Sequence, residues 1–382
     1  MIISRQLSQI LLRSKKSLLL LGPRQTGKST LIESLHPDLT INLADEQTYL
    51  DFAKNPSELE ERLDAREKTT VFIDEIQRLP SLLNTLQSII DQRKDRTRFF
   101  LTGSSARKLK RGKANLLPGR IHVYHLGPLS VAELGDAFNT KQALETGTLP
   151  GIYTENSNQE RVKTLRSYSA TYLKEEIQAE ALTRNLEGFS RFLFVVAQCS
   201  GQFVDFTKLA SEAQISRQSA TRYFEILEDT LIVHRCPSFS KSGRMRLIQH
   251  PKFYFFDSGV LNALLGNFQL SEDRKGILFE HLFFNQLIAS AYSHDIEIKV
   301  SSYRTEHAAE VDFIVELENE VWAIELKASR NVRKSILTGF KSFADYYRKP
   351  HRSVVAYMGH VAKTIAGIDI VPWQELLKKM NL

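Results

Sequence analysis

The stretch Ser17-Leu-Leu-Leu-Leu-Gly22-Pro-Arg-Gln-Thr-Gly27-Lys28-Ser29 decides the fold of the amino-terminal part of this chain. Its apolar first half predicts a buried strand, and the spacing of Thr30–Leu35 predicts a helix directly after the loop. The segment between them fits the pattern G-x-x-x-x-G-K-[ST], in which backbone N–H groups at a helix N-terminus bind phosphate oxygens. The sequence therefore predicts a phosphate-binding loop (P-loop) between its proper strand and helix.

The loop has an expected role in binding ATP and Mg²⁺. Lys28 would reach the β- and γ-phosphates, and the Ser29 hydroxyl would ligate Mg²⁺. The remaining residues expected to bind this cofactor are Gly22, Pro23, Arg24, Gln25, Thr26, Gly27, Thr30 and Asp74.

Acidic and hydroxyl side chains follow two further predicted strands. Thr69–Ile73 ends in Asp74-Glu75, and the carboxyl end of a parallel strand faces the ligand crevice of such a sheet. Asp74 would hold Mg²⁺ through water, and Glu75 would polarise the water that attacks ATP. After the strand Arg98–Leu101, Thr102 or Ser104 would sense the γ-phosphate, although either hydroxyl could equally cap a helix.

Length, composition and charge describe a globular chain of more than one domain. The 382 residues are 42% hydrophobic and 25% charged, and they are too many for one core. A net charge of +7 favours an anionic partner, with nucleic acid as the first candidate. We find no apolar segment of membrane-spanning length and no signal peptide, and two cysteines are too few for a disulfide framework or a zinc site. We therefore expect a cytoplasmic protein without a membrane partner.

Beyond a strand–helix alternation that runs to about Leu126, the pattern changes to helices. The alternation predicts a doubly wound parallel sheet, which is an α/β fold. Further on, Phe206–Val233 predicts two helices joined by a short turn, with Ser216 as the N-cap of the second. That helix would expose Arg217, Gln218, Ser219 and Arg222, as in a DNA-reading helix-turn-helix with a strand pair as its wing. The same fold could equally serve packing or protein contact.

The third part of the chain contains a predicted hairpin with paired carboxylates. Glu310–Leu317 and Val321–Lys327 alternate as two strands around a turn at Glu318-Asn319, with Val311, Phe313, Val315 and Leu317 on one face. In this register Asp312 lies across from Glu325, and Lys327 follows two residues later. This is the D…E-x-K arrangement of restriction-endonuclease-like phosphodiesterases, in which Asp312, Glu325 and Lys327 are catalytic and the carboxylates bind a divalent cation. Glu280, inside an amphipathic helix expected at Gly276–Ile288, would complete the metal shell; a decorative charged hairpin is the alternative.

These features predict four segments. We expect a P-loop ATPase core at residues 1–135, a helical lid or connector at 136–190, a winged helix-turn-helix at 191–250, and a restriction-endonuclease-like domain at 251–382. The connector includes helical sequence over Arg161–Leu182.

The chain resembles bacterial and archaeal AAA-type ATPases whose C-terminal half is a domain of unknown function. The motifs that carry the resemblance are GPRQTGKST, VFIDEIQ, FFLTGSS, LPGR, LSVAEL, LPGIY, KFYFFDSGV, GILFEH, EVDFIVE and IELKAS. The resemblance implies an AAA-like core, a winged helix and a restriction-endonuclease-type fold, and it places Arg24 near phosphate. It also implies Arg120 as an arginine finger that acts in trans between subunits of a homo-oligomer, although this arginine could simply form an ion pair within the fold.

Three functions are compatible with these residues. The first is a Mg²⁺-dependent ATPase that drives a nucleic-acid-binding, nuclease-like C-terminal half. The second is a regulatory ATPase switch whose nuclease-like domain binds a partner without cutting it. The third is a DNA-binding transcription regulator that depends on Arg217 and Arg222.

Overall fold

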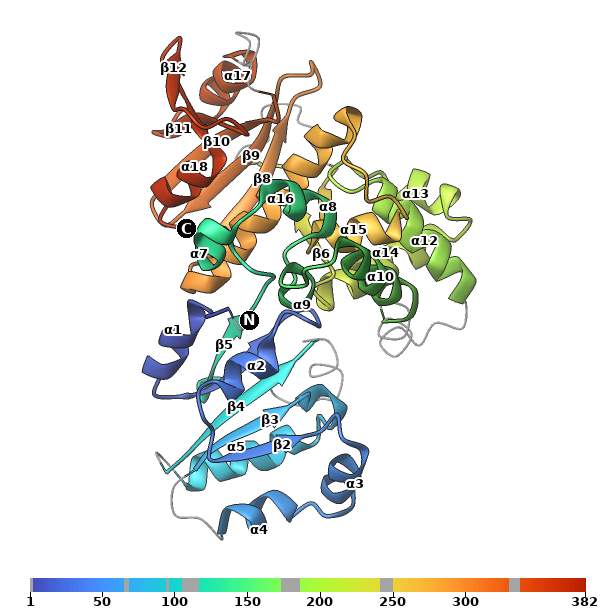
Figure 1. The fold of residues 1–382 in the computed structure, drawn as a ribbon, viewed down its shortest axis with the longest axis vertical. Helices are drawn as coiled ribbons and strands as arrows, with labels where there is room; N and C mark the ends of the chain where they lie inside the picture. The colour runs from blue at the N-terminus through green and yellow to red at the C-terminus, as the bar shows by residue number, and fades with distance from the viewer. Residues whose placement is uncertain are drawn as a thin grey trace.

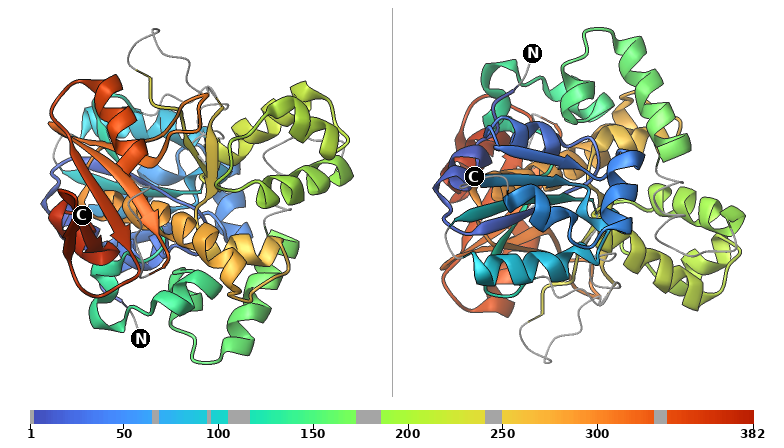
Figure 2. Two further views of the ribbon diagram at one scale, coloured as in Figure 1. Left: turned by 90° about the horizontal axis from the view of Figure 1, so that it is seen from above. Right: turned by 90° about the horizontal axis from the view of Figure 1, so that it is seen from below.

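The described part of the chain contains two large sheets, a two-stranded hairpin and a group of helices between them. The structure is a computed structural model that describes residues 3–64, 69–93, 96–104, 117–172, 186–240, 250–329 and 337–382. A five-stranded sheet lies at the bottom of Figure 1 and a six-stranded sheet lies at the top (Figure 1). Figure 2 shows that the helices from the middle of the chain project to one side of both sheets.

The amino-terminal sheet is entirely parallel. Its strands have the order β2-β3-β4-β1-β5, so β4 lies between β1, which precedes the P-loop, and β3, which ends in Asp74. The predicted parallel α/β sheet is confirmed. The strands are β1 (Ser17–Leu21), β2 (Leu39–Asn42), β3 (Thr69–Asp74), β4 (Thr97–Gly103) and β5 (Ile121–His125).

Helices cover both faces of this sheet. Leu18 and Leu20 of β1 face a cluster that includes residues of α1 (Leu7–Arg13) and α2 (Lys28–Glu33). Leu19 and Leu21 face the opposite cluster, formed with α3 (Glu46–Lys54), α4 (Glu58–Asp64) and α5 (Leu82–Gln92). Because both faces are covered, every residue of β1 is buried, as its continuous apolar run requires.

Short helices lead from the first sheet into the middle of the chain. They are α7 (Val131–Leu134), α8 (Thr140–Thr146), α9 (Pro150–Tyr153) and α10 (Asn158–Ser167), followed by a π-helical turn at Tyr168–Tyr172. The second part of the helix expected at Arg161–Leu182 lies outside the described residues. The chain continues with α12 (Leu186–Gln198), α13 (Phe206–Glu212), α14 (Arg217–Asp229), the antiparallel hairpin β6 (Val233–Cys236) and β7 (Lys252–Phe255), and α15 (Ser258–Leu264).

Asp257 docks the connector onto α15. Its carboxylate caps that helix by accepting the Val260 N–H at 3.1 Å, and it also accepts the Thr148 N–H at 2.8 Å. Gly147 adopts a left-handed φ of +74°, and a Cβ there would lie 2.0 Å from the Asp257 carboxylate. Burial raises the pKa of Asp257 to about 6, against the hydrogen bonds that favour its charged form.

The carboxy-terminal sheet is mixed, with the order β12-β13-β11-β10-β9-β8. The helix α16 (Glu272–His294) precedes it, and α17 (Leu337–Tyr347) connects β10 to β11. Residues of α16 and α17 belong to different hydrophobic clusters, on the two faces of the sheet. The remaining elements are β8 (Ile298–Arg304), β9 (Glu310–Leu317), β10 (Glu320–Lys327), β11 (Arg352–Tyr357), β12 (Lys363–Ile365), β13 (Ile368–Pro372) and α18 (Trp373–Lys379).

Two local expectations in this region are wrong. The helix expected at Gly276–Ile288 as an amphipathic element runs from Glu272 to His294, and from Leu278 onward it is buried on nearly all sides. The reason is that α16 contacts both β10 of the carboxy-terminal sheet and the elements α1 and β5 of the amino-terminal part. Val311 does not share the face of Phe313, because an irregularity in the β8–β9 register near Ser301 and Tyr303 shifts the alternation.

The distal half of α16 is fixed against the segment that follows β5. The Gln286 amide accepts the Val131 N–H at 2.6 Å and donates to the Leu129 carbonyl at 3.1 Å. Tyr292 stacks on His125 with ring centroids 5.1 Å apart. Within the described part of the chain, no helix has both the length and the apolar character that a bilayer span requires.

Candidate functional site

The P-loop connects β1 to α2 in a conformation that needs its glycines. Gly27 precedes α2 with a left-handed φ of +87°, and a Cβ on Gly22 would lie 2.2 Å from the Leu126 carbonyl oxygen. The Lys28 ammonium donates to the carbonyls of Gly22 at 2.8 Å and Pro23 at 2.9 Å. The buried Lys28 side chain therefore folds back over the P-loop and binds the carbonyls at its start.

Side chains from α2, β3 and β4 converge next to this lysine. Ser29 Oγ donates to the two carboxylate oxygens of Asp74 at 3.0 and 2.9 Å. The Thr102 hydroxyl at the end of β4 also donates to Asp74 and is fully buried. A hydroxyl and a carboxylate in direct contact are the oxygen ligands that Mg²⁺ takes at protein–nucleotide sites, so these residues fit the expected cation.

Glu75 adopts a strained backbone conformation next to Asp74. Its φ is +58°, in the left-handed region that non-glycine residues seldom occupy and that often marks functional positions. Its N–H donates to Thr102 Oγ1 at 3.2 Å, and its carboxylate accepts the side-chain amide of Gln77.

Gln77 was not assigned a role from the sequence. Its amide nitrogen bridges the Glu75 carboxylate and Ser104 Oγ, the latter at 3.1 Å, and the side chain is buried. Ser104 therefore contacts Gln77, which binds the expected base Glu75, whereas Thr102 contacts Asp74 directly. The only sequence signal for Gln77 is its place two residues after Glu75 in VFIDEIQ.

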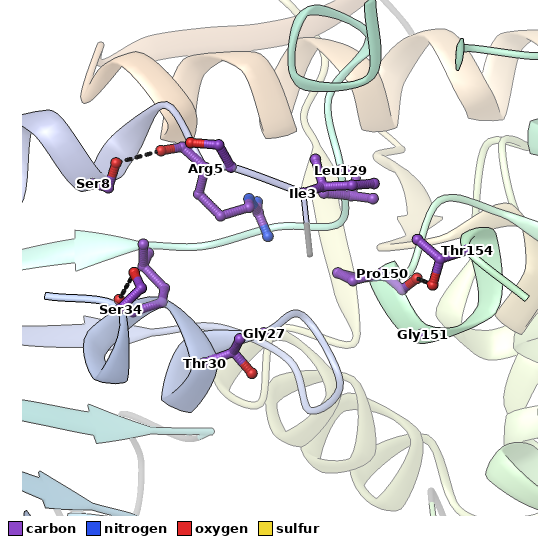
Figure 3. A pocket seen from close by; sticks show the side chains of 12 residues that line it. Ile3, Arg5, Ser8, Gly27, Thr30, Ser34, Leu129, Pro150, Gly151 and Thr154 are labelled. Carbon is purple, nitrogen blue, oxygen red and sulfur yellow. Dashed lines mark hydrogen bonds between the residues drawn. The ribbon is translucent and has the colours of Figure 1, made fainter. Parts of the chain in front are cut away.

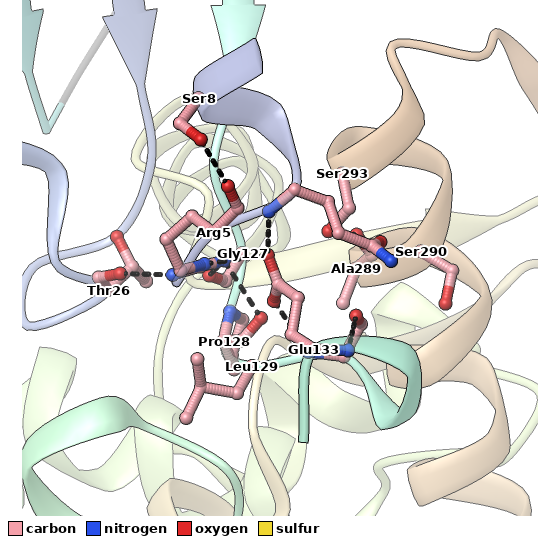
Figure 4. A network of polar contacts seen from close by, with 12 residues as sticks. Arg5, Ser8, Thr26, Gly127, Pro128, Leu129, Glu133, Ala289, Ser290 and Ser293 are labelled. Carbon is pink, nitrogen blue, oxygen red and sulfur yellow. Dashed lines mark hydrogen bonds and ion pairs between the residues drawn. The ribbon is translucent and has the colours of Figure 1, made fainter. Parts of the chain in front are cut away.

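Arg5 fixes the P-loop to the segment after β5, and sequence reasoning missed it entirely. Figure 4 shows its guanidinium between the loop and α7 (Figure 4). It donates to the Thr26 carbonyl at 2.7 Å, to the Gly127 carbonyl at 3.0 Å and to Glu133 Oε1 at 2.8 Å. The side chains of Arg5 and Glu133 are 6% and 0% exposed, so this ion pair is buried.

A cavity of about 390 Å³ opens beside the start of α2. Figure 3 shows it between the amino-terminal segment around Arg5, Thr30 of α2 with Ser34 at the end of that helix, and Pro150 of α9 with Thr154 just after that helix (Figure 3). Its size is in the range of small-molecule sites. Thr30 is thus at a cavity wall next to Gly27.

The other predicted nucleotide residues occupy varied positions. Gln25 has a φ of +62° at the exposed tip of the loop, and Thr26 Oγ1 donates to the Pro23 carbonyl at 2.8 Å. Arg24 is half-buried in the same loop. Arg120 forms a two-pronged ion pair with Asp91, at 2.7 and 2.8 Å, within the chain.

A second cluster of charged side chains lies on the β9–β10 hairpin. The paired residues run from Glu320–Leu317 to Ile324–Phe313, and the expected pairing of Asp312 with Glu325 would be the next step of that register. Asp312 Oδ2 accepts the Leu326 N–H at 2.7 Å, and the Lys327 ammonium donates to Glu325 Oε1 at 2.8 Å.

Lys252 of β7 enters this cluster and was not predicted to do so. Its ammonium donates to Glu280 Oε1 at 3.0 Å and lies 3.3 Å from Glu310 Oε1. The Tyr254 hydroxyl donates to the same Glu280 oxygen at 2.6 Å. The Lys252 side chain is only 4% exposed. Its sequence signal is the first position of KFYFFDSGV, to which no role was given.

The pKa values of this cluster reflect crowded, buried charge. Burial, followed by Glu325 and Glu280, raises the pKa of Asp312 well above its usual range. Burial likewise raises the pKa of Glu325. For Lys252, burial would lower the pKa, but Glu280, Asp312 and Glu310 outweigh it and raise the pKa.

The expected metal shell of Glu280, Asp312 and Glu325 is not formed. In the described ranges, no three histidine, cysteine or acidic side chains are placed to hold a metal ion. The physical reason is that Lys252 and Tyr254 engage Glu280, and Lys327 engages Glu325. These residues do not fit a divalent cation as they stand.

Comparison with protein families divides the chain into three matched segments. Residues 14–135 match an AAA domain and are a domain of that P-loop ATPase type. Residues 138–271 match a domain of unknown function (DUF8612), and residues 275–376 match another (DUF4143). The resemblance to AAA-type ATPases with a C-terminal domain of unknown function is thereby confirmed.

Two curated relatives align along most of the chain. The uncharacterized proteins Rv2008c of Mycobacterium tuberculosis and Mb2031c of Mycobacterium bovis are each 28% identical over 338 residues. The alignments cover 84% of this chain and 73% of theirs.

Solved structures show only remote similarity. PCH-2 of C. elegans is 16% identical with a TM-score of 0.27, over 59% of this chain and 65% of that one, which is less than two thirds of its length. A DNA polymerase III gamma subunit-related protein of Thermotoga maritima is 12% identical with a TM-score of 0.24, over 59% of this chain and 98% of that one. Protein VC1899 of Vibrio cholerae is 12% identical with a TM-score of 0.22, over 96% of both chains. The assignment of the ATPase domain therefore relies on the strand order and the family match.

Proposed function

We propose that this chain binds and hydrolyses ATP with Mg²⁺ and that the hydrolytic cycle changes how its C-terminal half engages a nucleic acid. The observation that carries the ATPase is the convergence of Lys28, Ser29, Asp74 and Thr102 at one edge of the parallel sheet. Bound Mg²⁺ would neutralise phosphate charge as it develops. Lys28 would leave its loop carbonyls for phosphate oxygens, and Glu75 would orient the attacking water while Gln77 holds its carboxylate.

The cavity beside α2 supports a seat for the nucleoside. It adjoins Gly27 and Thr30 at the phosphate end, and Ile3, Leu129 and Pro150 supply apolar wall. A purine needs a mostly apolar slot with a few polar groups, which this lining provides.

ATP turnover of purified protein tests the proposal. Lys28→Ala should abolish turnover and nucleotide binding, whereas Lys141→Ala, a lysine 73% exposed on α8, should leave both unchanged. Turnover by Lys28→Ala at the wild-type rate would overturn the assignment.

The proposal for the C-terminal half keeps the four expected segments, 1–135, 136–190, 191–250 and 251–382. The helices α12 to α14 support a winged helix-turn-helix, because Ser216 caps α14 and Arg217, Gln218 and Arg222 are exposed on it. Its wing would be the β6–β7 hairpin, whose second strand begins just beyond residue 250. The order α16-β8-β9-β10-α17-β11 supports a restriction-endonuclease-like fold.

Nucleic-acid binding is measurable by fluorescence anisotropy with labelled DNA at two salt concentrations. Arg217→Ala combined with Arg222→Ala should weaken binding and reduce its salt dependence, whereas Arg13→Ala on the exposed side of α1 should not. If wild type, the double variant and Arg13→Ala all bind DNA equally, Arg217 and Arg222 do not contact nucleic acid. The result would then favour a regulatory ATPase switch whose partner is a protein.

Phosphodiester cleavage is the second candidate function, which would require the cluster to open to a divalent cation. It is supported by the position of Asp312 on β9 beside β10, the strand that carries Glu325 and Lys327. Plasmid and single-stranded DNA incubated with wild type and Asp312→Ala provide the test. Cleavage that Asp312→Ala abolishes and Lys28→Ala retains would assign it to this cluster.

We also propose a homo-oligomer in which Arg120 acts in trans. Its ion pair with Asp91 would have to open for that role. Sedimentation velocity with and without ATP tests whether the protein forms an oligomer. If Arg120→Ala hydrolyses ATP at the wild-type rate, Arg120 is not an arginine finger.

A further inference from the structure

We propose that the Lys252 ammonium is the built-in cation of the second cluster and excludes the divalent ion that a nuclease-like domain would take. The inference refines the proposed C-terminal half, but it holds or fails independently of ATP turnover. It rests on where Lys252 lies and on what the neighbouring carboxylates already bind.

Residues from three separate parts of the chain surround the Lys252 side chain. Its ammonium contacts Glu280 of α16 at 3.0 Å and Glu310 of β9 at 3.3 Å, and it lies 5.0 Å from the centre of the Phe203 ring. Two carboxylates and an aromatic face compensate the loss of water around a side chain that is 4% exposed. A long flexible lysine held in this way is a fixed positive charge of the site.

One oxygen of each of the three carboxylates already accepts a hydrogen bond within the cluster. One Glu280 oxygen accepts both Lys252 and Tyr254, one Glu325 oxygen accepts Lys327, and one Asp312 oxygen accepts a backbone N–H. A divalent ion bound to Glu280 would lie next to a buried ammonium, where low polarisability strengthens the repulsion between the two cations. In the proposed role, this repulsion keeps the ion out as long as Lys252 stays in the cluster.

Lys252 enters the cluster from a hairpin that belongs neither to α16, which carries Glu280, nor to the carboxy-terminal sheet, which carries the remaining residues of the cluster. It is the first residue of β7, whose partner strand β6 follows α14 directly. The β6–β7 hairpin, proposed as the wing of the helix-turn-helix, therefore supplies the cation that occupies the nuclease-like cluster. This placement makes Lys252 a positioning residue of the second cluster.

The test is Mn²⁺ binding to nucleotide-free full-length protein, followed by electron paramagnetic resonance and calorimetry. Wild type should have no Mn²⁺ site that depends on Asp312. Lys252→Met should acquire one Mn²⁺ site, at least about tenfold tighter than any wild-type binding, which corresponds to about 1.4 kcal/mol. Adding Asp312→Asn to Lys252→Met should remove that site again.

Matched variants separate charge from structure. Lys252→Arg keeps the positive charge and should bind no Mn²⁺, and Lys299→Met, an exposed lysine on β8, should behave as wild type. Circular dichroism and ATP turnover of the same preparations report folding; if Lys252→Met unfolds, Lys252→Gln replaces it.

Two outcomes would overturn the inference: Mn²⁺ binding by wild type that Asp312→Asn abolishes, or no gain of Mn²⁺ binding in folded Lys252→Met and Lys252→Gln. Either result with normal ATP turnover would leave the ATPase proposal intact. Absent turnover with the expected Mn²⁺ pattern would remove only the ATPase.

Discussion

Replacing Arg5 by methionine should destabilise the ATPase unit and impair ATP turnover together. The substitution removes the positive charge that pairs with buried Glu133 at 2.8 Å, along with donors to the Thr26 and Gly127 carbonyls. Breaking such a pair from one side costs about 3–5 kcal/mol, because a buried carboxylate is left behind. Glu133 keeps the N–H groups of Ser130 and Gln6, so we expect about 3 kcal/mol from the pair.

The two carbonyls that lose a donor add about 1 kcal/mol, which gives a total loss of about 4 kcal/mol. At about 2–4 °C per kcal/mol, the melting temperature of this unit should fall by about 10 °C. Differential scanning calorimetry with and without ATP measures the shift. Arg13→Met, on the exposed side of α1, is the matched control and should change the melting temperature by less than about 2 °C.

A double-mutant cycle isolates the ion pair itself. Arg5→Met in a Glu133→Gln background should cost less than in wild type by about 1.5–3 kcal/mol, because no buried charge is left unpaired. Single losses that add within about 0.5 kcal/mol would refute the coupling, and an unchanged melting temperature for Arg5→Met would refute the role of the whole network.

Three further predictions address catalysis, packing and pH. Glu75→Gln should retain ATP binding but lower turnover by about 10²–10⁴-fold, measured by calorimetry and phosphate release; unchanged turnover would exclude Glu75 as the base. Gly147→Ala should cost about 3 kcal/mol in denaturant melts, because φ is +74° and the new Cβ meets Asp257, whereas Gly276→Ala in exposed helix should be neutral or stabilising by about 0.5–1 kcal/mol. The buried Asp257 has a pKa of about 6 against an ordinary 3.8, so its contribution to stability is fully present below pH 3.8 and is lost as pH rises through about 6. Between pH 5 and 7 wild type should therefore lose about 1 kcal/mol relative to Asp257→Asn, and parallel pH profiles of the two proteins would contradict the buried titration.

The parts of the molecule that sequence alone predicted are those whose information is local. The P-loop strand, turn and helix lie within residues 17–33, and the hairpin register follows from alternation around a turn at Glu318. Ser216 was predictable as a helix cap because capping is a local interaction: its hydroxyl accepts the N–H of Ser219, three positions away.

The residues that sequence reasoning missed act through contacts between distant segments. Arg5 bonds Glu133 across 128 positions, and Lys252 bonds Glu280 across 28 positions from a different element. No periodicity links such partners, and each residue by itself is an ordinary basic side chain. The burial of α16 was misjudged for the same reason: its outer face is covered by the connector and the ATPase side, which the helix's own sequence does not encode.

The length of α16 fixes the relative orientation of the side chains at its two ends. Glu280 and Tyr292 lie on one continuous helix, about 18 Å apart along its axis, and each meets a different domain. One residue inserted between them would turn the distal half by about 100° and swing the Tyr292 ring away from His125, while Glu280 kept its place. Because each inserted residue also lengthens the helix by about 1.5 Å, adding whole turns would not restore the contact either. The two contacts of α16 are therefore compatible only with its present length.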